Sequence, residues 1–175
     1  MGGILAKTGQ RKKEPVGGTK KELVIITKPA VTPSQIERDE RKRKLLLVLK
    51  ILDEQGGIYE RSLAHLIYYL QKDKDIDLGY NFYMVGDVPT SKELHEDTVA
   101  LLYVGYAETN PRTKKLRLTS EGKEFLSKME YDNELFESLK NAIDELKPKI
   151  SAIDVQIELT TMLMRQSGRR RRRSF

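Results

Sequence analysis

Hydrophobic residues in the middle of the chain follow helical spacing, and glycine or proline separates the expected elements. A first helix is expected over 34–55, because Ser34 and Glu37 match a capping box and Gly56-Gly57 ends the pattern. Two further helices are expected over 60–72 and 92–104. Their apolar positions are Leu63, Leu66, Ile67 and Leu70 in one and Leu94, Leu101 and Leu102 in the other.

The N-terminal half of the first expected helix is almost wholly charged over residues 37–44. Charged side chains are costly to bury without partners, so we expect this half to project from the core or to lie on a partner. Ion pairs between residues three or four positions apart explain its mixed signs without any ligand.

Two stretches break the helical pattern. Residues 73–90 are aromatic and contain Gly79 and Gly86, so we expect a loop with a short extended piece. Residues 106–109 and 115–119 are short β-prone runs on either side of a polar turn, which indicates a β-hairpin. A further helix is expected to begin directly after this hairpin.

The last helical region, residues 132–166, has a heptad-like apolar seam, and Pro148 is expected to kink it. The seam has two interpretations, packing on its own domain or pairing with a second copy. We favour pairing, and therefore a homodimer, because the region is acidic outside the seam and long for a small core to cover. The predicted dimer contacts are Leu139, Ile143, Leu146, Ile150, Ile153, Ile157 and Met164.

Composition removes several functional classes. The chain has no Cys, which excludes a disulfide scaffold, a thiolate zinc site and a cysteine nucleophile. With two His and no recognisable catalytic motif, we expect neither a metal site nor a cofactor, and no enzyme activity. No apolar run approaches the roughly 20 residues that span a bilayer, so we expect a cytoplasmic protein that does not enter membranes.

Positive charge is concentrated at the two ends of the chain. Residues 1–33 contain seven Lys or Arg against two Glu, and residues 165–175 contain six Arg and no acid. Such runs are typical of flexible arms that bind polyanions, because arginine pairs with phosphate in two-point contacts. The candidate arm residues are Arg11, Lys12, Lys13, Arg169, Arg170, Arg171, Arg172 and Arg173.

The stretch L-L-Y-V-G-Y-A-E (101–108), followed by L-R-L-T-S-E-G-K-E-F-L (116–126), resembles the end of archaeal and bacterial winged helix-turn-helix regulators. The resemblance implies a mostly α fold with a small β-hairpin (α+β). The expected regions are a basic arm over 1–33, a winged-helix domain over 34–130, a long helix over 131–166 and an Arg-rich tail over 167–175.

In that family the third helix reads the DNA major groove and the hairpin, or wing, touches the backbone. Carried over by position, the helix contacts are Ser91, Lys92 and His95, and the wing contacts are Arg112, Lys114, Lys115 and Arg117. The same helix carries Glu93, Glu96 and Asp97, which repel phosphates. Most of the affinity is therefore expected from the wing and the two arms.

These patterns favour a dimeric DNA-binding transcriptional regulator or nucleoid-associated protein. One alternative is an RNA-binding, ribosome-associated factor, because basic arms for RNA and for DNA look the same in sequence. The other alternative is a protein-interaction adaptor built on a winged-helix scaffold, which the acidic third helix supports.

Overall fold

The computed structural model describes the backbone of residues 31–171 and the side-chain surroundings of residues 31–164. Within that range the chain is mostly helical, with two small antiparallel strand pairs and a long C-terminal helix. The sequence predicted the helical content, the long last helix and one of the two strand pairs. The arm residues Arg11, Lys12 and Lys13 lie outside the described residues, and so do Arg172 and Arg173. Arg169, Arg170 and Arg171 lie within the last helix, but their side chains are outside the described set.

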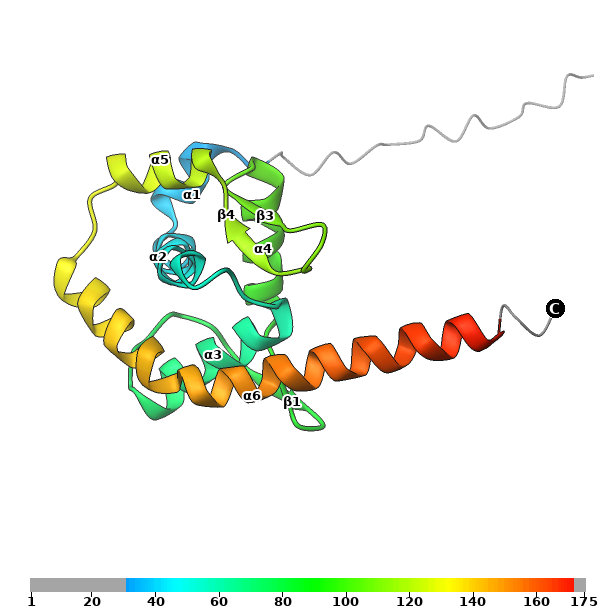
Figure 1. The fold of residues 1–175 in the computed structure, drawn as a ribbon. Coiled ribbons are helices and arrows are strands. Elements are labelled where there is room, and N and C mark those ends of the chain that lie inside the picture. The colour runs from blue at the N-terminus through cyan, green and yellow to red at the C-terminus, as the bar shows by residue number, and fades with distance from the viewer. Residues whose placement is uncertain (1–30, 172–175) are drawn as a thin grey trace, which may run out of the picture. The chain divides into compact units, whose positions relative to one another are not determined.

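Ten elements follow one another along the described chain (Figure 1). They are α1 Pro33–Arg38, α2 Glu40–Glu54, α3 Glu60–Asp73, β1 Tyr83–Val85, β2 Val88–Thr90, α4 Lys92–Val104, β3 Ala107–Thr109, β4 Leu116–Leu118, α5 Ser120–Lys128 and α6 Asn133–Arg171.

The first expected helix is two helices, which corrects the prediction over 34–55. Asp39 interrupts the helix with extended backbone (φ −90°, ψ 106°), and its carboxylate accepts hydrogen bonds from the backbone N–H groups of Arg41 and Lys42. An aspartate in that position caps the start of α2. The predicted Ser34–Glu37 capping box is also wrong. The cap of α1 is Thr32, because Pro33 fits best at the first helical position.

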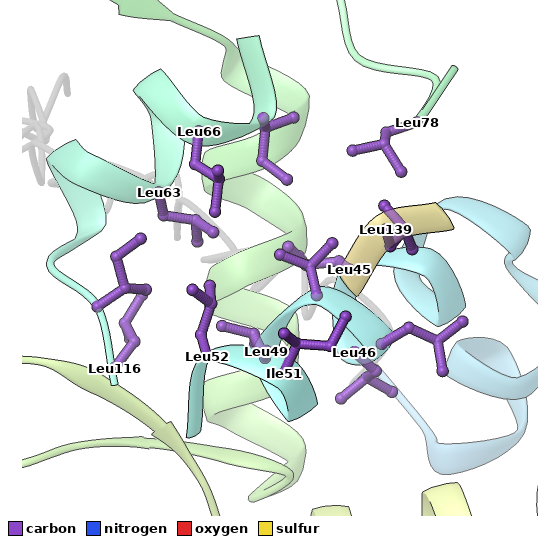
Figure 2. Close-up of a cluster of buried hydrophobic side chains, with 14 of the residues drawn as sticks. Leu45, Leu46, Leu49, Ile51, Leu52, Leu63, Leu66, Leu78, Leu116 and Leu139 are labelled. Atoms are coloured by element: carbon purple, nitrogen blue, oxygen red, sulfur yellow. The ribbon is translucent and has the colours of Figure 1, made fainter. Parts of the chain in front are cut away.

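Helix α2 occupies the centre of the domain. Figure 1 shows it nearly end-on, with the other helices arranged around it. Its C-terminal part is buried on most sides rather than along one stripe, as is typical of a helix inside a core. Figure 2 shows its side chains packed against residues from α3, β4, α6 and the 74–82 connection. The buried residues of α2 are Leu45, Leu46, Leu47, Val48, Leu49, Ile51 and Leu52.

The predicted hairpin is confirmed as β3 and β4, paired antiparallel with Ala107 opposite Leu118. Ile58 adds a third, one-residue strand. Its backbone N–H donates to the Leu116 carbonyl (3.1 Å), and the Leu116 N–H donates back (2.7 Å). This exchange joins the segment between α2 and α3 to the hairpin.

The connection over 73–90 contains more structure than expected. Strands β1 and β2 form a second hairpin that turns at Gly86 (φ 61°), and β2 packs on α3. The side chains of Tyr83, Met84 and Val85 on β1 are all more than half exposed.

The T-S-E-G motif closes the small sheet onto α5. The Thr119 hydroxyl accepts a hydrogen bond from the Gly122 N–H (3.0 Å) and donates one to the Gly105 carbonyl (2.6 Å). Gly122 lies directly against the Tyr106 carbonyl, where a Cβ atom would overlap the backbone. The motif therefore needs a glycine for space rather than for a special backbone angle.

Helix α6 continues as one helix through Pro148 and packs on α3 and α2. The predicted dimer seam is corrected over its first half. Leu139, Ile143, Leu146 and Ile150 are buried in the core of their own chain, so they are not available to a second copy. Ile153 packs partly on that core, Ile157 is half-buried and Met164 is exposed.

The charged half of the first expected helix needs correction in part. The expected ion pairs within the helix are present between Lys42 and Asp39 and between Lys44 and Glu40, but Arg41 and Lys42 also pair with an acid inside the domain. Asp97 of α4 is 2% exposed, and its carboxylate contacts Arg41 Nε (2.6 Å), Lys42 Nζ (3.0 Å) and the Tyr80 hydroxyl (3.2 Å). The hydrogen bond to Asp97 raises the pKa of Arg41 above its ordinary value, and burial raises the pKa of Tyr80. This cluster joins α2, α4 and the 74–82 connection.

Replacing Gly122→Ala should destabilise the domain, because the added methyl group has no room beside the Tyr106 carbonyl. We expect a loss of about 2–3 kcal/mol in the free energy of unfolding, measured by urea denaturation. The control is Ser120→Ala, which changes an exposed residue at the first position of α5. Equal stability of Gly122→Ala and the wild type would contradict the packing described here.

Replacing Asp97→Asn should leave the partly buried Arg41 without its ion-pair partner and Lys42 paired with Asp39 alone. Breaking a buried ion pair costs about 3–5 kcal/mol. We expect about 2–3 kcal/mol, because the Arg41 side chain is 31% exposed. The matched control is Glu96→Gln, one residue away and exposed, which should change stability by less than about 0.5 kcal/mol. Chemical denaturation of both variants tests this, and similar values for the two would argue against the cluster.

Candidate functional site

Ser91, predicted as an outward contact, is a structural cap instead. Its side chain is buried, and its hydroxyl oxygen accepts a hydrogen bond from the Leu94 N–H (3.3 Å) at the start of α4. The same hydroxyl donates to the carboxylate of Glu93 (3.0 Å). A serine at this position satisfies an unpaired N–H of the first helical turn, so it does not face a ligand.

Lys92 and His95 do lie on the solvent side of α4. Lys92 Nζ lies 3.6 Å from Glu96, and His95 Nδ1 lies 2.8 Å from the carboxylate of Glu60 on α3. All four side chains are well exposed, so these pairs are weak and exchangeable. Sequence reasoning missed Glu60 as the partner of His95, because the two are far apart in the chain.

The rest of the solvent side of α4 is apolar. Val99 and Tyr103 are exposed one and two turns beyond His95. We call Lys92, His95, Glu96, Val99 and Tyr103 the outer face of α4. Asp97 does not belong to it, because it points inward to Arg41 and Lys42. The predicted repulsion by three acidic residues is therefore reduced to Glu93 and Glu96.

The turn between β3 and β4 is organised by its own hydrogen bonds. The side-chain oxygen of Asn110 accepts from the N–H groups of Arg112 (2.9 Å) and Thr113 (3.1 Å). Lys114 adopts a left-handed backbone angle (φ 64°). Arg112 and Lys114 are exposed, and neither forms an ion pair with any residue that the structure describes.

Lys115 and Arg117, predicted as contacts on the same hairpin, are held by acids of the domain. Lys115 Nζ lies 3.3 Å from Asp154 of α6 and 4.9 Å from the ring centre of Tyr59. Arg117 Nε lies 3.3 Å from Asp53 at the end of α2. Both side chains are half-buried, so they fix the hairpin in place rather than project from it.

Asp53 accepts a second cation that sequence reasoning missed, Lys123 of α5 (2.7 Å). Burial raises the pKa of Asp53, but the hydrogen bonds and charges of Lys123 and Arg117 lower it more, and the net pKa lies below its ordinary value. The carboxylate therefore stays ionised at neutral pH and joins α2, β4 and α5. No local sequence pattern predicts a contact between residues this far apart.

His65, interpreted from the sequence as a structural residue of the second helix, is buried, and its Nδ1 has no hydrogen-bond partner in the described part of the chain. Burial lowers the pKa of His65 below its ordinary value, and the charge of Arg61 lowers it further. A neutral imidazole is therefore favoured at that position.

Among the residues that the structure describes, no group of three or more His, Asp or Glu side chains is placed to hold a metal ion. Over the same range, every helix is too short or too polar to cross a bilayer.

The outer face of α4 and the 110–115 turn belong to neighbouring elements, because α4 packs against β3 and Gly105, with left-handed backbone, ends α4 shortly before β3.

Comparison of this chain with protein-family models, with curated protein sequences and with solved structures finds no match.

Proposed function

We propose that this protein is a winged-helix nucleic-acid-binding protein that is not an enzyme, and that its ligand is DNA. The order α2, Ile58, α3, α4, β3, β4, α5 supports this, since it is the order expected of a winged helix apart from the β1–β2 hairpin between α3 and α4. In this interpretation α4 faces the major groove and the 110–115 turn is the wing.

The observation that carries the proposal is the division of charge in the hairpin. Lys115 and Arg117 are neutralised by Asp154 and Asp53, whereas Arg112 and Lys114 extend from an ordered turn without a counter-ion in the described part of the chain. Cations that the fold leaves unpaired are available to phosphates, and their binding releases counter-ions.

The outer face of α4 contributes few charges, so binding is expected to depend mainly on the wing and on the basic ends of the chain. Affinity of this kind falls steeply with salt and depends little on base sequence. It suits a nucleoid-associated protein or a regulator that acts in the cytoplasm. Tighter binding to structured RNA than to duplex DNA at matched salt would point instead to a ribosome-associated factor.

We propose that the distal arm of α6, residues 155–164, pairs with a second copy of the chain. Its side chains Val155, Leu159, Met162 and Leu163 are each more than half exposed, a concentration of apolar surface that is unusual for an isolated helix. Parallel pairing would bring two arginine runs together. Antiparallel pairing instead directs each run toward the acidic 132–158 stretch of the other copy.

A second candidate function is protein binding through the β1–β2 hairpin. The exposed side chains of Tyr83, Met84 and Val85 favour it, because aromatic and Met side chains are common at protein interfaces. A chain that retains neither DNA nor RNA at low salt would support this candidate over the first.

The double variant Arg112→Gln/Lys114→Gln should weaken binding to a 20-base-pair duplex and reduce its salt dependence. Each lost phosphate contact lowers the slope of log affinity against log salt by about 0.9, so a decrease of about 2 is expected. Fluorescence anisotropy over a range of KCl concentrations measures it.

The matched control is Lys123→Gln/Lys128→Gln, which removes the same charge from α5, where Lys123 is paired with Asp53 and Lys128 with Glu124. Its salt dependence should remain close to that of the wild type. If both double variants reduce the slope equally, general charge rather than the wing governs binding.

The double variant Leu159→Glu/Leu163→Glu should convert a dimer to a monomer, because it places four carboxylates in an apolar contact between two arms. Light scattering after size-exclusion chromatography measures the mass. Thr161→Glu serves as the control, since it adds a charge on the opposite side of the same helix. A wild-type chain that is monomeric at all accessible concentrations would overturn this part of the proposal.

A further inference from the structure

The 74–90 connection has no role in the proposed nucleic-acid interface, yet it builds one wall of a cavity. The cavity has a volume of about 330 Å³ and lies between α3, β2 and α4. A tight helix-turn-helix connects these two helices with three or four residues, which leaves no chain for such a wall. The extra length therefore produces the cavity.

The inner surface of the cavity is mainly apolar. It is lined by Leu63 and Ala64 of α3, by Val88 and Pro89 of β2, and by Leu94 of α4. Three hydroxyl groups also line it, those of Thr90, Ser91 and Thr98, but each donates a hydrogen bond within the protein. The interior is thus suited to an apolar group of modest size.

The charged residues of the cavity are Glu60 and Arg61, adjacent in sequence at the start of α3, with His95 opposite them on α4. One carboxylate oxygen of Glu60 contacts His95 Nδ1 (2.8 Å), which leaves its other oxygen available to a ligand. Arg61 forms no ion pair with any residue that the structure describes. A guanidinium that can bind an anion, Arg61, and a carboxylate that can bind a cation, Glu60, therefore lie side by side at an apolar pocket.

We propose that this cavity binds a free α-amino acid with an apolar side chain. The carboxylate of the ligand pairs with the Arg61 guanidinium, which offers a two-point contact, and its ammonium group pairs with Glu60. Its side chain enters the pocket formed by Leu63, Ala64 and Leu94. An apolar amine alone would leave Arg61 without a partner, and an apolar acid alone would add no contact to Glu60 beyond the one that it makes with His95.

The site does not depend on the proposed function, but its effect on nucleic-acid binding does. Leu94 and His95 belong to α4, so an occupant contacts the helix that carries the outer face. Ligands that contact one element are thermodynamically linked, and each changes the affinity of the other by the same factor. In that setting the amino acid is an effector of nucleic-acid binding.

The test is a titration of the full chain, followed by amide chemical shifts, with four probes. L-leucine carries all three features, 4-methylpentanoate lacks the ammonium group, 3-methylbutylamine lacks the carboxylate, and L-serine lacks the apolar side chain. Leucine is expected to shift the amides of residues 60–64 and 88–95. Each of the other probes is expected to bind about tenfold more weakly.

Two exposed substitutions assign the charges without disturbing the core. Arg61→Gln should weaken leucine about tenfold and leave 3-methylbutylamine unchanged, whereas Glu60→Gln should weaken leucine and leave 4-methylpentanoate unchanged. Ala64→Trp should fill the pocket and abolish binding, with circular dichroism confirming the fold. Arg112→Gln, an exposed arginine of the hairpin outside the cavity, is the matched control for Arg61.

Equal binding of leucine and 4-methylpentanoate would overturn the assignment of a zwitterionic ligand. Absence of shifts at residues 60–64 and 88–95 up to about 20 mM leucine would overturn the site itself. These titrations contain no nucleic acid, so their failure leaves the proposed function untouched. Conversely, a chain that ignores DNA and RNA would still be expected to bind leucine.

Discussion

The burial of α2 is the constraint on which the rest of the structure depends. A helix covered on most sides needs several neighbours, and here they are α1, α5, α6 and β4, together with side chains of α3 (Figure 2). Because the N-terminal turns of α2 are charged, burial also requires counter-charges from outside the helix. Asp97 provides them for Arg41 and Lys42, and Asp39 caps the helix start. Hydrophobic packing of its C-terminal part and charge neutralisation of its N-terminal part therefore both fix the position of α2 in the domain.

Ion pairs between elements also determine which charges remain free on the surface. Acids of the helices bind cations from other elements, as Asp53 of α2 does with Arg117 and Lys123, and as Asp154 of α6 does with Lys115. These pairs hold the hairpin and α6 against the domain. The cations left over on the hairpin lie at its tip. In the function proposed here, the surface that binds polyanions is defined as much by which charges the fold neutralises as by which residues are basic.

Helix α6 combines two environments in one continuous element. Its first half completes the core through Leu139, Ile143 and Leu146. Farther along, Asp154 and Glu158 accept hydrogen bonds from Ser62 and Tyr59 at the start of α3. Its distal arm has an equally apolar sequence but a far more exposed environment. The heptad-like seam therefore serves intramolecular packing over its first half. In the function proposed here, self-association uses a different apolar stripe of the same helix, Val155, Leu159, Met162 and Leu163.

The sequence by itself determined the helices around Leu63, Leu94 and Leu101, the β3–β4 hairpin and the start of α5, because these depend on local periodicity, capping and turn chemistry. Local pattern also identified the cations of the β3–β4 hairpin, but it did not distinguish the unpaired Arg112 from Lys115, which pairs with Asp154. Only the tertiary structure decided that Ser91 is a helix cap and that Asp97 points inward. It also decided that the first half of the α6 seam is buried, and that Glu60, Arg61 and His95 line one cavity. The physical reason is that charge pairing and burial depend on residues distant in the chain, and periodicity carries no information about which distant residue supplies the partner.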